Sequence, residues 1–244
     1  DAYNTAVGYD SGLLMTTGIH NTLIGAGAGD ALTTGSYNTV LGYNALTTED
    51  AHGYNTAIGY QALNAMDAGA DAYNVAVGHN AGAAVTTGQL NTLVGALVGD
   101  ALTTGDRNVA IGYQALSAED TGGRNIAIGY RALYDQNYDG NAYNIGVGYL
   151  AGENISTGLN NTIVGGLAGD ALTTGGNNTA IGKNALSSED ANSYNVAVGT
   201  NALNTLNAGA DGYNVAVGYD TGGLMSTGVN NVLAGGLAGD ALTS

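Results

Sequence analysis

The sequence predicts an all-β fold, a parallel β-solenoid of about 14 rungs. One motif recurs along the whole chain: Asn, any residue, a small or aliphatic residue, an aliphatic residue, then Gly. The spacing between successive motif Asn residues runs 17, 17, 17 and 19 residues and then repeats, so four rungs form a super-repeat of 70 residues. We therefore expect a single elongated solenoid over residues 1–244, built of repeats 1–70, 71–140 and 141–210 and a partial repeat 211–244.

The motif Asn opens each rung. Parallel stacking would place these residues above one another at intervals of about 4.8 Å, the spacing of hydrogen-bonded strands. Stacked Asn side chains can hydrogen-bond along such a column, so we predict a structural ladder. Its members are Asn4, Asn21, Asn38, Asn55, Asn74, Asn91, Asn108, Asn125, Asn144, Asn161, Asn178, Asn195, Asn214 and Asn231.

A short strand follows each motif Asn. In the first rung, alternation places Thr5 and Val7 on one face and Ala6 on the other. Both faces are apolar in this way throughout the chain, which is typical of strands that are buried on both sides. One solenoid has only one interior, so we expect the second face to be covered by another copy of the chain.

A return segment completes the rung. An Ala-Leu pair, as at residues 45–46 and 62–63, predicts a second short β segment whose Leu points inward. Polar turns follow, and they differ by rung: second rungs carry Gly-Asp-Ala-Leu-Thr-Thr-Gly (29–35), third rungs an acidic turn that includes Glu49-Asp50, and fourth rungs two extra residues.

Composition and charge exclude several classes of function. Gly accounts for 42 residues, Pro, Cys, Trp and Phe are absent, and the net charge is −16 with only four Lys and Arg residues. Nucleic-acid binding needs a basic face, and membrane insertion needs a long apolar run, so neither is expected. The three His residues lie in dissimilar rungs and group no nucleophile with a base. We expect no enzyme activity and no required cofactor.

The segments Asn-Thr-Ala-Ile-Gly-Tyr-Gln-Ala-Leu (55–63) and Asn-Val-Ala-Ile-Gly (108–112) resemble the head repeats of trimeric autotransporter adhesins. They are equally similar to Asn-x-Ala-Ile-Gly repeats of phage tail-fibre-like proteins. The resemblance covers every rung, although these rungs are longer than those common in the adhesin family. It implies a left-handed parallel β-roll assembled as a trimer, with the motif strands near the threefold axis.

One turn suggests calcium. The segment that begins Asp-Gln-Asn-Tyr-Asp-Gly at residue 135 matches the first half of a calcium loop, although the Glu expected at its twelfth position is replaced by Gly146. Calcium is therefore a possible ligand, and a plain polar turn is the alternative. The candidate ligands are Asp135, Asn137, Asp139 and Asn141.

Tyrosine occurs at regular positions. Seven of the sixteen Tyr residues precede a motif Asn and seven follow a motif Gly, where their rings can stack on the next rung. The second group could form a binding strip for glycans or proteins at a cell surface, and packing is the alternative interpretation. Its members are Tyr9, Tyr43, Tyr60, Tyr113, Tyr130, Tyr149 and Tyr219.

These patterns favour a non-catalytic, extracellular structural or adhesive fibre segment, at a cell or virion surface, that associates with itself as a trimer or a head-to-tail filament. The filament remains open because a copy joined after Ser244 would place its Asn4 in phase with Asn231. A phage or virion tail-fibre shaft is one alternative. An ice- or calcium-binding solenoid is another, suggested by regular Thr-Thr-Gly turns such as that at 33–35.

Overall fold

The structure, a computed structural model, describes residues 2–244 and is a β-solenoid of about fourteen turns. The predicted fold class is confirmed: the described residues form fourteen parallel strands and no helix. Two compact units are present, the first ending at Gly123 and the second spanning Arg124–Ser244. Each unit is described by itself below.

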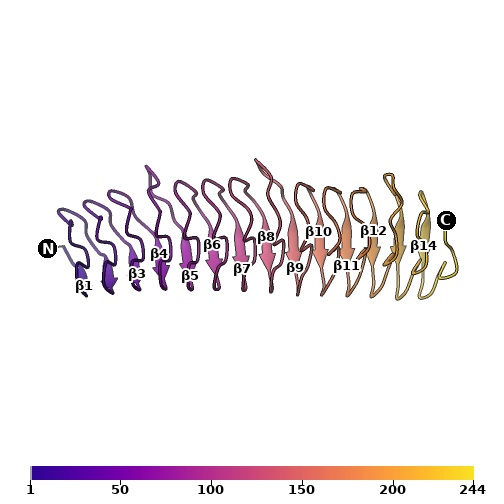
Figure 1. The fold of residues 1–244 in the computed structure, drawn as a ribbon, viewed down its shortest axis with the longest axis horizontal. Helices are drawn as coiled ribbons and strands as arrows, with labels where there is room; N and C mark the ends of the chain where they lie inside the picture. Colours follow the sequence, from indigo (N-terminus) through magenta and orange to yellow (C-terminus); the bar gives the residue numbers. More distant parts are fainter. Residues whose placement is uncertain (1) are drawn as a thin grey trace. The chain divides into compact units, whose positions relative to one another are not determined.

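Each coil contributes one strand of three residues, which begins directly after the motif Asn. Within each unit, every strand pairs in parallel with the strand of the next coil, and the return segments lie on the opposite side of the coils (Figure 1). The first unit holds β1 (Thr5–Val7), β2 (Thr22–Ile24), β3 (Thr39–Leu41), β4 (Thr56–Ile58), β5 (Val75–Val77), β6 (Thr92–Val94) and β7 (Val109–Ile111). The second holds β8 (Ile126–Ile128), β9 (Ile145–Val147), β10 (Thr162–Val164), β11 (Thr179–Ile181), β12 (Val196–Val198), β13 (Val215–Val217) and β14 (Val232–Ala234).

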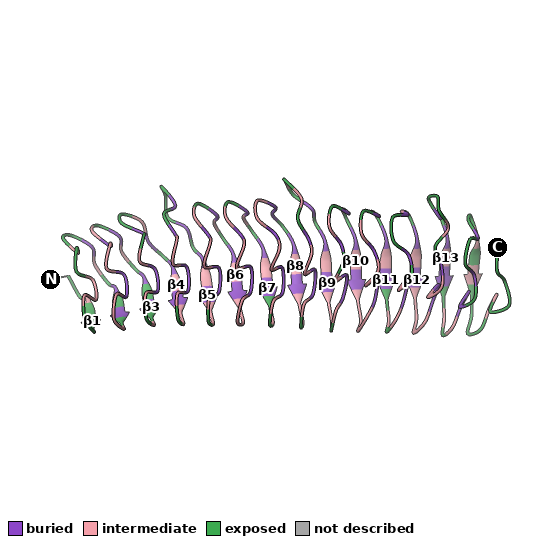
Figure 2. Cartoon of the chain, in the orientation of Figure 1, coloured by how far each residue is buried: buried purple, intermediate pink, exposed green. Residues whose placement is uncertain are grey.

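The strands have one buried and one outward face. In β6 the central Leu93 is fully buried, whereas Thr92 and Val94 are partly exposed. Figure 2 shows the same alternation along most strands of both units, whereas β1 is exposed throughout and β14 has no buried position. The outward face is apolar, as predicted, and within each described unit it is not covered by other parts of that unit.

The predicted second β segment is wrong. Residues 45–46 lie in a turn, because Asn44 and Leu46 both take left-handed backbone conformations, with φ of 50° each, and these end an extended chain. Leu46 is nevertheless fully buried. The apolar pair therefore predicts the interior position correctly but not the conformation that places it there.

Large and small side chains alternate between coils to fill a thin core. Gly82, in the return segment of a first-type coil, has a φ of 57°, and a Cβ there would lie 2.7 Å from Leu93 Cδ1 and 3.2 Å from Leu63 Cδ2. The Leu residues of the preceding and following coils thus occupy the space that this coil leaves open. Because such packing requires side chains of different size in neighbouring coils, it disfavours one uniform repeat.

The motif Asn side chains form a hydrogen-bonded ladder within each unit. The backbone N–H of Asn108 donates to Oδ1 of Asn91 at 2.9 Å, and Asn91 N–H donates to Asn74 Oδ1 at 2.9 Å. Equivalent bonds of 2.8–3.2 Å join the other motif Asn residues within each unit. The residue before the Asn, such as Tyr73 with a φ of 55°, has a left-handed backbone. The extended chain is interrupted there, and the Asn side chain supplies the hydrogen bond between neighbouring coils.

The same side chain also closes its own coil. Asn91 Nδ2 donates to the carbonyl of Gly105 at 2.9 Å, fourteen residues further on. Fourth-type coils are two residues longer, and the turn no longer returns to this point. Asn55 Nδ2 is consequently buried without a hydrogen-bond partner, although Asn55 Oδ1 still accepts from Asn74 N–H.

We predict that Asn91→Ala destabilises the protein more than Asn55→Ala. The first change leaves two buried groups unpaired, the N–H of Asn108 and the carbonyl of Gly105, at a cost of about 2–4 kcal/mol. The second change leaves one buried group unpaired, at a cost of ~1–2 kcal/mol, because Asn55 Nδ2 has no hydrogen-bond partner to lose. Urea unfolding followed by circular dichroism measures both midpoints, with the exposed Thr87→Ala as control. Equal shifts for the two Asn variants would contradict the role of coil closure.

Candidate functional site

A column of interior side chains runs through the coils at the position eleven residues after each motif Asn. Most coils place Leu, Met, Ile or Val there, as with the buried Leu32 and Met66. Third-type coils place Glu49, Glu119 and Glu189 there, and all three are fully buried. The predicted acidic turn therefore places its Glu carboxylate in the core, and only the Asp that follows faces outward.

Backbone N–H groups hold the Glu49 carboxylate inside the coil. Oε1 accepts a hydrogen bond from His52 N–H at 3.0 Å, and Oε2 accepts one from Ala68 N–H of the next coil at 3.3 Å. The imidazole Nδ1 of His52 lies 3.2 Å from Oε1. These contacts compensate part of the free energy lost when a carboxylate leaves water.

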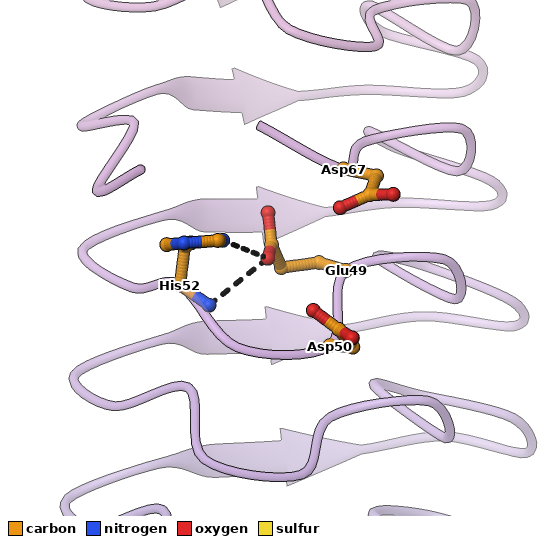
Figure 3. Close-up of side chains that lie close together, drawn as sticks. All are labelled: Glu49, Asp50, His52 and Asp67. Carbon is orange, nitrogen blue, oxygen red and sulfur yellow. Dashed lines mark hydrogen bonds and ion pairs between the residues drawn. The ribbon is translucent and has the colours of Figure 1, made fainter. Parts of the chain in front are cut away.

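Two further carboxylates gather at this point (Figure 3). Asp50 comes from the same coil as Glu49 and His52, and Asp67 from the following coil. One ligand atom from each of these four residues lies within 4.8 Å of the other three. Glu49 is buried, His52 is half-buried, and Asp50 and Asp67 are exposed, so the group forms a shallow site with a fixed base and an open side.

The equivalent turn of the second unit has the same Glu but different neighbours. Glu189 Oε1 accepts from Asn192 N–H at 3.3 Å, whereas Oε2 is buried without a hydrogen-bond partner. Asn192 and Asn207 stand where the first unit has His52 and Asp67. Burial raises the pKa of the Glu189 carboxyl, the bonds to Asn192 oppose this, and the negative charge of Asp190 adds to it.

The predicted calcium ligands lie in the turn that follows β8. Asp135 is half-buried, and its N–H donates to the carbonyl of Glu153 at 2.9 Å. Gln136 points into the interior column, while Asn137, Asp139 and Asn141 are exposed. Side chains of this turn therefore point both into the interior and toward solvent. Calcium binding by the four predicted ligands stays a prediction.

Stacked aromatic rings form a column beside the motif Asn residues in the first unit. The ring centroids lie 4.9–5.2 Å apart with interplanar angles of 3–19°. Partial burial by its neighbours raises the pKa of Tyr54, and the charges of neighbouring Tyr residues and Asp71 raise it further. The sequence analysis missed His20 as a member, although it shares its position with the Tyr residues, directly before a motif Asn. The column consists of Tyr3, His20, Tyr37, Tyr54 and Tyr73.

The proposed binding strip forms shorter stacks. Tyr43 stacks on Tyr60 at 5.6 Å, Tyr60 on His79 at 5.1 Å, and Tyr130 on Tyr149 at 5.4 Å. His79 again shares its position with the Tyr residues, here directly after a motif Gly. Because stacked rings cover one another's faces, these members offer ring edges and hydroxyl groups rather than the open ring faces that a sugar packs against, whereas Tyr9 and Tyr219 are 80% and 59% exposed.

The Thr-Thr-Gly turns commit their first hydroxyl to the fold. Thr33 Oγ1 donates to the carbonyl of Asp50 at 3.0 Å, and Thr103 Oγ1 to that of Asp120 at 2.9 Å. These hydroxyl groups bond the next coil and are not an open array for ordering water, so the structure adds no support for ice binding.

Comparison with protein-family models, curated proteins and solved structures finds no match for this chain. Among residues 2–244, no helix has the length and apolar character that crossing a bilayer requires.

We predict that Glu189→Gln stabilises the protein increasingly as the pH rises from about 4 to 7. The pKa of Glu189 is raised in the folded state, so the folded state holds the proton more tightly than the unfolded state, whose Glu pKa is about 4.3. Stability from this group is present below that pH and is lost as the pH rises through the folded pKa. Gln136 occupies the same column position and is buried there, so the coil accommodates Gln.

Urea unfolding at a series of pH values measures this difference. The matched control is Asp240→Asn, which removes one negative charge from an exposed residue of another coil. A constant difference in stability between parent and Glu189→Gln from pH 4 to pH 7 would contradict the prediction.

Proposed function

We propose that the chain is a non-catalytic structural segment of an extracellular fibre or adhesin, and that it associates laterally with copies of itself through the outward strand face. The observation that carries the proposal is the exposed apolar row on this face. In the first unit, Val7, Ile24 and Leu41 are 57%, 36% and 45% exposed, and in the second unit Val217 is 44% exposed. Parallel strands with apolar residues on both faces are normally covered on both.

A second copy is the partner that best fits this face. The outward strand positions are Thr, Val, Ile, Leu or Ala in every coil, with no charged residue, in a chain whose net charge is −16. Two such faces can meet without bringing like charges together, whereas the acidic turns would repel each other. Each coil contributes one strand to this face, so the outward side chains of a second copy have the same spacing along the solenoid.

The resemblance to adhesin head repeats supports a trimer as the stoichiometry, with the strand faces around a common axis. Three copies would bury the Val, Ile and Thr side chains of the outward face and leave the turns, with their carboxylates and Tyr edges, toward solvent. A fibre built in this way presents its turns along its length, where contacts with a cell surface would be made.

We predict that the parent chain forms a discrete oligomer and that the paired change Leu41→Lys and Ile111→Lys shifts it toward monomer. Both side chains lie on the outward strand face and are 45% and 37% exposed, so the charges should spare the interior and oppose association. We expect the dissociation constant to rise more than about tenfold, since burying unpaired charges costs more than 1.4 kcal/mol. Sedimentation velocity over a range of concentrations measures the species present.

The control pair is Thr17→Lys and Thr104→Lys, which adds the same charge at exposed turn positions and should leave the oligomer intact. Circular dichroism checks that each variant keeps its strands. A parent chain that sediments as a monomer at all concentrations would refute lateral association, and an open series of larger species would favour the filament over the trimer.

A further inference from the structure

We propose that Glu49, Asp50, His52 and Asp67 form a binding site for a divalent cation of the zinc class, which joins the third and fourth coils of the first unit. The four side chains are the densest group of ligand-type residues among residues 2–244, with one ligand atom of each within 4.8 Å of the others. Neither the lateral association nor the calcium turn involves these residues.

The arrangement has one rigid ligand and three adjustable ones. Glu49 is fully buried, and backbone N–H groups of two successive coils fix its carboxylate. Asp50 and Asp67 are exposed and can change rotamer freely (Figure 3). Three carboxylates so close together repel one another, and a bound cation would remove that repulsion.

A second observation comes from the other unit, at the same turn. There Glu189 keeps its place in the core, but Oε2 is buried without a hydrogen-bond partner. The Glu49 turn supplies a backbone N–H to each carboxylate oxygen, whereas the Glu189 carboxylate is bonded at Oε1 alone. The two positions that border this carboxylate are His52 and Asp67 at the first turn and Asn192 and Asn207 at the last, and the corresponding residues after Glu119 are Gly122 and Asn137. Both metal-ligand side chains therefore occur at one of the three Glu turns.

The ligand types select the cation. Calcium and magnesium take oxygen ligands almost exclusively, whereas an imidazole nitrogen combined with carboxylates suits zinc and its first-row neighbours. Zinc binds N and O ligands at about 2.0–2.2 Å, so tetrahedral ligand atoms lie roughly 3.4 Å apart. The present spacing of up to 4.8 Å needs a modest contraction, which the exposed Asp50 and Asp67 can provide.

Binding would have two physical consequences. His52 Nδ1 now lies 3.2 Å from Glu49 Oε1, and an ion bound between the two side chains would replace this contact. Asp67 belongs to the coil after the one that holds the other three ligands, so the ion would link two coils and raise the temperature of unfolding.

The test is calorimetric titration of the full chain with Zn²⁺, together with thermal unfolding with and without zinc. We expect one saturable site per chain, which the double variant His52→Asn/Asp67→Asn loses, with affinity reduced at least tenfold. This variant reproduces the residues of the second unit, Asn192 and Asn207, in a coil that folds with them. The other His residues, the remaining carboxylates and the Glu49 core position are unchanged in it.

Asp67→Asn alone, an exposed change that leaves the interior intact, should also weaken zinc binding and remove most of the zinc-dependent thermal shift. Equal zinc affinity and stoichiometry in the parent and the double variant would overturn the proposal. So would a parent chain that takes up zinc without any rise in its unfolding temperature.

Discussion

One side chain per coil, the motif Asn, makes the two hydrogen bonds on which the stack depends. Its Oδ1 accepts the backbone N–H of the next motif Asn, as between Asn91 and Asn108, and its Nδ2 returns to a carbonyl fourteen residues later in its own coil. Both bonds can form only when every coil has nearly the same length. The fourth-type coil breaks this condition with its two extra residues, and the buried, unpartnered Nδ2 of Asn55 is the local consequence.

Within that frame, the interior is filled by side chains that must differ from coil to coil. The coils are too thin for large aromatic residues, and Leu side chains of one coil enter space that a Gly leaves open in its neighbour. A first-type coil therefore offers Gly82 and Ala76, and Leu63 and Leu93 enter from below and above. The same column of interior positions tolerates a carboxylate in one coil of four, because the turn N–H groups beside it, such as that of His52, can bond it.

The period of the sequence predicts the solenoid, the strands and the alternation of their faces, because each depends on spacing alone. It does not predict the conformation of the return segment: Leu46 is left-handed, and a bulky non-Gly residue rarely takes that conformation unless its surroundings impose it. The burial of Glu49 was missed because a Glu beside Asp50 in a polar turn is normally solvated. Alignment of the coils by their motif Asn would have found it, since Leu32 and Met66 occupy the same position in the neighbouring coils. The gathering of Asp67 with His52 depends on how the longer coil folds over the shorter one, which spacing does not specify.

The packing of Leu side chains against a Gly of the neighbouring coil has a consequence for how such a chain can lengthen. Within each unit a strand touches only the strands before and after it, so copying a whole block of 70 residues reproduces every neighbouring pair of coils. Losing a single second-type coil would instead place Gly82 against a coil whose strand carries only Ala110, and the space now filled by Leu93 would be empty. Duplication of a whole block of four coils therefore preserves the packing between neighbouring coils, whereas loss of a single second-type coil does not.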